Sequence, residues 1–168
     1  MKLAPQRTLR YYYLKFVRLQ GEPAEIARGV GLGIFIGITP TIPLHTVLIL
    51  FCTLVSRSSK IAGLLASVAV SNPLTIPPTY FLSWKLGVLV TGTDISWVDI
   101  KSAIDLVLSD AGFMDRMAAV AQLGREALVT LLLGGFVFAL PFGLAGYFLS
   151  YRFFAAIERK RRQKHILR

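Results

Sequence analysis

Two long apolar stretches, residues 26–55 and 61–90, are each interrupted near the middle by prolines. The first break holds Pro40 and Pro43, and the second holds Pro73, Pro77 and Pro78. Each stretch is therefore expected to form two half-helices. A half-helix of about 12 residues covers roughly 20 Å, less than the ~30 Å hydrocarbon layer of a bilayer. Both breaks are expected at membrane depth, where irregular backbone is tolerated only beside protein or a wet cavity, and where paired breaks indicate a binding site.

Composition places the chain among integral membrane proteins. It has 168 residues, enough for one domain, of which 54% are hydrophobic, and its mean hydropathy is +0.60. The single cysteine, Cys52, excludes an internal disulfide. No cleavable signal peptide is visible, because cations are spread through the first 18 residues without a compact apolar core.

The net charge of +10 is concentrated at the two ends of the chain. Residues 1–28 hold six Lys or Arg, residues 152–168 hold seven, and acids outnumber cations in residues 94–126. Under the positive-inside rule this pattern predicts cytoplasmic termini and an external middle segment. A basic run beside a membrane span is typical of a topology signal and of contact with anionic lipids, so no nucleic-acid partner is expected.

The expected fold is an all-α integral membrane protein with a single membrane domain. Its parts are an interfacial helix (1–21), two interrupted segments (22–92), a polar amphipathic connector (93–126), a transmembrane helix (127–151) and a basic cytoplasmic tail (152–168). Glycines and other small residues in the apolar segments predict close approach between helices. In the connector, Ser96 and Asp99 form a capping box, and Ile100, Ile104, Val107 and Leu108 form one apolar face.

The two interrupted segments differ in the path expected of them. Arg57 and Lys60 follow the first segment, which predicts a re-entrant hairpin that returns to the cytoplasm. The second segment is expected to be a broken spanning helix, because the helix at 127–151 needs an earlier outward crossing; a second re-entrant hairpin remains the alternative. The similar break sequences at residues 40–43 and 74–77 suggest a degenerate internal duplication.

The apolar segments lack the groups that catalysis or metal binding needs. No Asp or Glu occurs in residues 26–93, which excludes a carboxylate dyad there. His45 and Cys52 are the only strong nitrogen or sulfur ligands and stand seven residues apart without partners. No serine belongs to a recognisable nucleophile, His and Asp constellation. We therefore expect no enzyme, no catalytic residue, no metal and no cofactor.

The polar residues of the apolar segments gather at the two breaks. The candidate substrate-binding residues are Thr39, Thr41, His45, Thr46, Asn72, Thr75, Thr79 and Lys85. Half-helices beginning at Leu44 and Pro78 would turn free amides and positive dipole ends toward a phosphate or carboxylate. His45 would sense or carry a proton, and Lys85 would supply a fixed cation.

Structural roles for the same residues remain open. Thr39, Thr41, Asn72 and Thr75 are also the residue types that cap half-helices and satisfy carbonyls freed by proline. His45 would serve equally as a structural hydrogen-bonding group. Lys85, beside Trp84 and near Tyr80, would extend toward an interface.

The sequence resembles a family of small bacterial membrane proteins known as domain of unknown function 2062 (DUF2062). The resemblance lies in the run Gly33-Ile34-Phe35-Ile36-Gly37, in Leu44-His45-Thr46 after a proline break, and in Asn72-Pro73-Leu74-Thr75-Ile76-Pro77-Pro78 followed by Tyr80. Many relatives carry glycine where this chain has Pro43. The resemblance implies a multi-pass protein of the bacterial inner membrane. Some relatives are fused to glycosyltransferases that use polyprenyl-phosphate sugars, which implies lipid-linked carriers as partners.

Two functions follow as hypotheses. The first is a small transporter, or flippase-like protein, for a phosphate-bearing lipid or another amphiphilic anion, with its site where the two breaks meet. The second is a non-catalytic scaffold whose basic ends position a partner such as a polyprenyl-phosphate glycosyltransferase. A homo-oligomer is compatible with either, since one copy of this size encloses little. The absence of acids argues against a third candidate, an intramembrane lipid-modifying enzyme.

Overall fold

The computed structural model describes residue 19 and residues 21–41, 44–72, 74–109, 112–122 and 124–166. These ranges contain helices and no strand, as expected. The helices are α2 (Pro23–Ile38), α3 (His45–Val55), α4 (Lys60–Val70), α5 (Ile76–Thr91), α6 (Trp97–Leu108), α7 (Phe113–Gln122) and α8 (Gly124–Ile166). The interfacial helix expected within residues 1–21 falls almost entirely outside the described residues.

Both expected breaks are present. The first separates α2 from α3, and the second separates α4 from α5. The four helices have 16, 11, 11 and 16 residues. At 1.5 Å per residue they are about 24 Å or about 16 Å long, shorter than a hydrocarbon layer.

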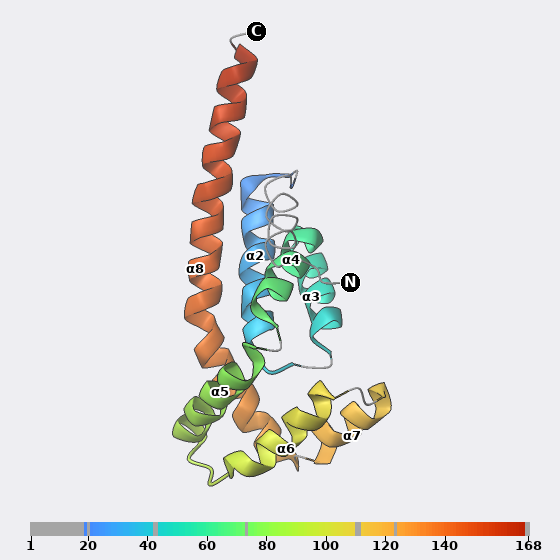
Figure 1. Cartoon of the computed structure of the whole chain (residues 1–168). Helices are drawn as coiled ribbons and strands as arrows, with labels where there is room; N and C mark the ends of the chain where they lie inside the picture. The colour runs from blue at the N-terminus through green and yellow to red at the C-terminus, as the bar shows by residue number, and fades with distance from the viewer. Residues whose placement is uncertain are drawn as a thin grey trace.

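The helices pack in two groups along α8 (Figure 1). Helices α2, α3 and α4 form a bundle, with α2 lying along α8. Helix α5 packs on the N-terminal part of α8, and α6 and α7 lie at that end of the molecule. The two halves of the first segment contact each other as a helical hairpin. The halves of the second segment pack against different partners, α4 against α2 and α5 against α8.

Small residues allow the backbones of α2 and α4 to approach closely. On α2, Gly29, Gly33 and Gly37 recur every four residues and face α4. A Cβ atom at Gly33 would strike the backbone carbonyl of Gly63. The expected close packing of the glycine face is thus confirmed, and small-residue interfaces of this kind are enriched between transmembrane helices.

The contact between α5 and α8 follows the same rule. A Cβ at Gly87 would strike the carbonyl of Thr130, and one at Gly134 would strike the carbonyl of Ser83. The hydroxyls of Thr91, Thr93 and Thr130 lie 2.8–3.3 Å apart at the end of this interface. Thr130 has no exposed surface, so these hydrogen bonds replace those that water would make.

Large apolar side chains point outward. In α3 only Ile49 and Thr53 are buried, while Val47, Phe51 and Leu54 expose 59–66% of their surface. In α8, Ala139, Gly143 and Gly146 face the protein. Exposed large residues of α8 include Phe136, Phe142, Leu144, Phe148 and Leu149. Large apolar residues such as Ile26, Ile49 and Phe154 are also buried, so what sets this surface apart is the number of large apolar side chains that it exposes.

Among the described residues, one stretch is long and apolar enough to span a membrane, residues Gly124–Lys160 of α8. It contains the transmembrane helix expected at 127–151. The helix itself continues to Ile166, through the segment expected to be a separate basic tail. Lys, Arg, Glu and Gln are good helix formers, and no Gly or Pro follows Gly146 to end the helix.

The connector forms α6 and α7, as its amphipathic pattern predicts. Ser96 Oγ accepts a hydrogen bond from the Val98 amide at the start of α6. Ile100 and Ile104 are 0% and 6% exposed and pack with Ile76 and Leu131 in a core cluster. The connector is therefore fixed to the start of α8 and to α5.

We expect Gly33→Ala to lower the free energy of unfolding by about 1–3 kcal/mol, because the new methyl group meets backbone that cannot move without shifting a helix. The higher helix propensity of Ala offsets only part of this cost. Thermal unfolding of the purified protein in detergent measures the difference. The matched control is Gly112→Ala, whose Cβ would meet only the Asp115 carboxylate at 3.3 Å. Equal melting temperatures for the two variants would contradict the packing argument.

Candidate functional site

The two breaks lie beside each other, joined by one contact between α2 and α4. The Ser71 hydroxyl, at the end of α4, donates a hydrogen bond to the Gly37 carbonyl near the end of α2. Gly37 also packs against Ser67. Both chain interruptions are therefore at the same level along the helix axes.

The threonines of the first break hydrogen-bond to their own chain. Thr39 Oγ1 donates to the Phe35 carbonyl at 2.8 Å. Thr41 Oγ1 lies 3.4 Å from the Ile36 carbonyl and 3.3 Å from the Thr39 carbonyl. These contacts satisfy carbonyls at the end of α2, which is the capping role considered above.

His45 and Thr46 are the first two residues of α3. The His45 side chain is half-buried and that of Thr46 is exposed. Neither side chain makes a hydrogen bond to any other residue that the structure describes. Helix α3 has no side-chain cap at Leu44, and residues 42 and 43 before it lie outside the described residues.

The second break is a compact turn built on Asn72 and Thr75. Asn72 Oδ1 accepts hydrogen bonds from the amides of Leu74 and Thr75, at 3.0 and 3.1 Å. Thr75 Oγ1 donates to the Val70 carbonyl and accepts from the Asn72 amide. The two side chains thus replace the helical hydrogen bonds that the break removes.

The start of α5 offers no free amide to an anion. The Ile76 amide donates to the Asn72 carbonyl and the Thr79 amide to the Thr75 carbonyl. Between them, Pro77 and Pro78 carry no N–H group. The expected pair of amide-bearing helix starts is therefore reduced to one, the start of α3.

Thr79 and Lys85 lie on α5, apart from the first break. Thr79 Oγ1 donates to the Thr75 carbonyl at 2.7 Å. Lys85 is exposed, next to Trp84, whose Nε1 donates to the Ile95 carbonyl at 2.9 Å. The packed helix pairs of the described chain do not include α3 with α5. The eight predicted residues thus form two groups, connected through Ser71 and Gly37.

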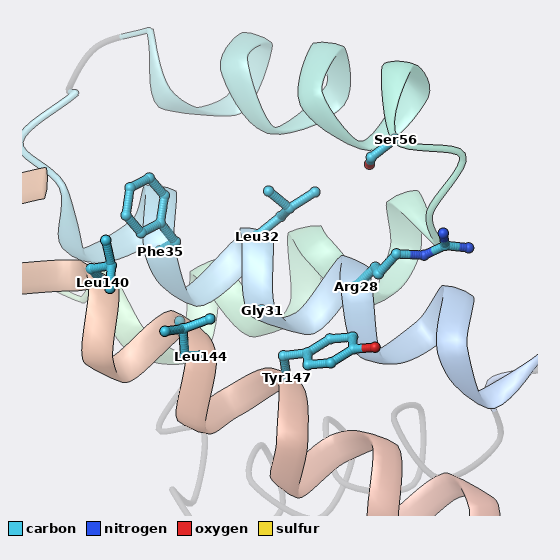
Figure 2. A pocket seen from close by; sticks show the side chains of 9 residues that line it. Arg28, Gly31, Leu32, Phe35, Ser56, Leu140, Leu144 and Tyr147 are labelled. Atoms are coloured by element: carbon cyan, nitrogen blue, oxygen red, sulfur yellow. The ribbon is translucent and has the colours of Figure 1, made fainter.

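The structure also has a groove between α2 and α8 that the sequence analysis missed. Its volume is about 330 Å³. It is lined by Arg28, Gly31, Leu32, Phe35, Ser56, Leu140, Gly143, Leu144 and Tyr147 (Figure 2). One sequence signal pointed to it, since Arg28 is the single charged residue in positions 26–56. Cys52 is a free thiol, and the described residues contain no group of three or more metal-ligating side chains.

We expect Asn72→Ala to lower the free energy of unfolding by about 1–2 kcal/mol, because two amides lose their acceptor at the turn. Thr46→Ala, at an exposed side chain of the other break, serves as the control and should change stability by less than about 0.5 kcal/mol. Thermal unfolding in detergent compares the two. An Asn72→Ala variant that unfolds at the same temperature as the wild type would show that the turn is held by other contacts.

Neither a curated protein nor a solved structure matches this chain. The profile of one family, described as "Uncharacterized protein conserved in bacteria (DUF2062)", matches residues 6–163, nearly the whole chain. With helices broken at the two proline motifs and a profile match of that extent, the chain belongs to the DUF2062 family.

Proposed function

We propose that this protein is a multi-pass protein of the bacterial inner membrane with both termini in the cytoplasm. The outward-facing apolar surface of α3 and α8 supports this placement, since exposed apolar surface of that extent needs lipid or another protein to cover it. In this placement α2 and α3 form a re-entrant hairpin. The second segment and α8 each cross the bilayer.

The charges of the described residues support the orientation. Cations at the end formed by the start of α2, the α3–α4 turn and the C-terminal part of α8 are Arg28, Arg57, Lys60, Arg152, Arg159 and Lys160 (Figure 1). Acids at the opposite end, on α6, α7 and their flanks, are Asp94, Asp99, Asp105, Asp115 and Glu126. The cationic end is the cytoplasmic one under the positive-inside rule.

Within this membrane placement, the proposed function is transport, of the flippase type, of a phosphate-bearing lipid or another amphiphilic anion. The observation that carries the proposal is the junction of the two breaks through Ser71 and Gly37. Beside it lies the start of α3, where the positive end of the helix dipole suits a phosphate oxygen. His45, in the same turn, would exchange a proton with the head group while the hydrocarbon tail stays in lipid.

A role as a scaffold is the second candidate, supported by the length of α8. This helix has 43 residues, about 64 Å, and extends beyond the bundle at the cationic end (Figure 1). A basic helix in that position could hold a cytoplasmic partner such as a polyprenyl-phosphate glycosyltransferase. The exposed face of α3 is equally suited to contact with a second copy of the chain.

The orientation predicts opposite labelling of two single-cysteine variants. In a Cys52→Ser background, Asp105→Cys on α6 should react with a membrane-impermeant maleimide on intact spheroplasts. Lys60→Cys should react only after the membrane is permeabilised. Both positions are exposed, so access to the reagent depends on the side of the membrane. Reaction of Lys60→Cys in intact spheroplasts would refute the proposed topology, and extraction by carbonate would refute insertion.

Transport is tested in liposomes that contain the purified protein and a fluorescent polyprenyl phosphate or phospholipid. We expect head-group movement between leaflets, reduced at least tenfold in His45→Ala. Ser102→Ala, at an exposed position of α6, is the control and should keep the wild-type rate. Absence of movement in the wild type would reject transport. The scaffold proposal is tested in cells that lack the native protein. A copy without residues 159–168 should fail to restore the wild-type phenotype, while the His45→Ala variant should restore it.

A further inference from the structure

The groove between α2 and α8 is almost wholly apolar, and Arg28 stands at one end of it. Leu32 and Phe35 from α2 and Leu140 and Leu144 from α8 form its wall (Figure 2). Arg28 and Tyr147 stand at the same end, and Ser56, the residue after α3, also lines the groove. Three segments far apart in sequence thus build one groove.

The groove exists because its floor has no side chains. Gly31 and Gly143 face each other where α2 and α8 touch, and a Cβ at Gly31 would lie 3.1 Å from the Gly143 carbonyl. The larger neighbours stand on either side of this contact. Phe35 is fixed by an edge-to-face contact with Phe136, with ring centroids 5.2 Å apart. The wall is therefore already formed before a ligand enters.

Among the residues that the structure describes, Arg28 has no counter-ion. Arg28 is exposed and forms no ion pair with any carboxylate that the structure describes. The Ser56 hydroxyl is occupied, since it donates to the Cys52 carbonyl at 2.7 Å and lies 2.8 Å from Ser58 Oγ. Arg28 and Tyr147 thus remain as the donors for a ligand. A guanidinium suits a phosphate because its N–H groups match two phosphate oxygens at once.

We infer that this groove binds a phosphate-bearing lipid, with one hydrocarbon chain along the apolar wall and the phosphate at Arg28 and Tyr147. The inference rests on the membrane placement proposed above and gives transport a cytoplasmic loading site. Arg28 lies in the first half of α2, whose start is at the cationic end of the bundle (Figure 1), the level of lipid head groups in that placement. The volume of about 330 Å³ lies at the small end of the range for ligand pockets and suits part of a chain, whose remainder stays in the bilayer.

The test measures lipid retention by native mass spectrometry on the full-length protein in detergent. The two probes are dioleoyl phosphatidic acid and dioleoyl phosphatidylcholine, which share their chains and differ in head-group charge. We expect preference for phosphatidic acid and a loss of about tenfold in its affinity in Arg28→Gln, the usual effect of losing one charge-assisted hydrogen bond. Arg152→Gln, an exposed arginine of α8 outside the groove, is the matched control. Equal losses in the two variants would overturn the inference.

A second variant and a competitor separate the lipid from its phosphate alone. Leu144→Gln changes an exposed wall residue and should weaken both lipids alike. Inorganic phosphate at millimolar concentration should not displace phosphatidic acid, because it gains nothing from the wall. Displacement by phosphate, or unchanged binding in Leu144→Gln, would leave only an anion site and contradict the inference.

Failure of the groove inference and failure of the transport proposal give different combinations of results. Loss of binding in Arg28→Gln together with no head-group movement in wild-type liposomes would reject transport and keep the groove as a lipid site. Movement lost in His45→Ala together with phosphatidic acid binding that does not depend on Arg28 would keep transport and reject the groove.

Discussion

The close approach of helix backbones is the constraint on which the rest of this structure depends. Gly33 lies against Gly63, and Gly134 lies against Ser83 and Gly87, without a side chain between the backbones. Such contacts give dispersion energy without requiring water to be expelled, so they stabilise helices in an apolar solvent. They also set the register of α2 against α4 and of α5 against α8. The register of α2 against α4 places the two breaks side by side.

Most polar side chains at the two breaks already have hydrogen-bond partners within the chain. Fewer of them are therefore free to bind a ligand than the sequence suggests. Asn72, Thr75 and Thr79 are used in hydrogen bonds within the second break, and Thr39 and Thr41 within the first. The polar cluster seen in the sequence thus consists largely of groups that complete interrupted helices. Of the eight predicted residues, His45, Thr46 and Lys85 are the ones whose side chains make no hydrogen bond to another described residue. The chemistry proposed for the junction therefore rests on a short segment.

The sequence predicted the local features of this fold and not the partners of its helices. The positions of both breaks, the glycine faces and the apolar side of α6 follow from residue spacing, because each depends on neighbours within a few turns. The groove depends on Arg28 and Tyr147, which are 119 positions apart and meet only through the register at Gly31 and Gly143. Free amides were also expected at the start of α5. Pro77 and Pro78 carry no N–H group, and the amides of Ile76 and Thr79 donate to backbone carbonyls. The sequence predicts residues 127–151 as the apolar span and does not address whether the helix continues into the basic tail, as α8 does.

The unequal packing of the two interrupted segments has a mechanical consequence. Helix α2 returns through α3 as a hairpin, with lengths of 16 and 11 residues, whereas α4 and α5 have 11 and 16 residues and diverge to separate partners. Carriers that rock two equivalent halves around a central axis need the halves to exchange shapes. These two segments are not interchangeable in one chain, so a transport cycle of the proposed kind would not rest on the exchange of two equivalent halves.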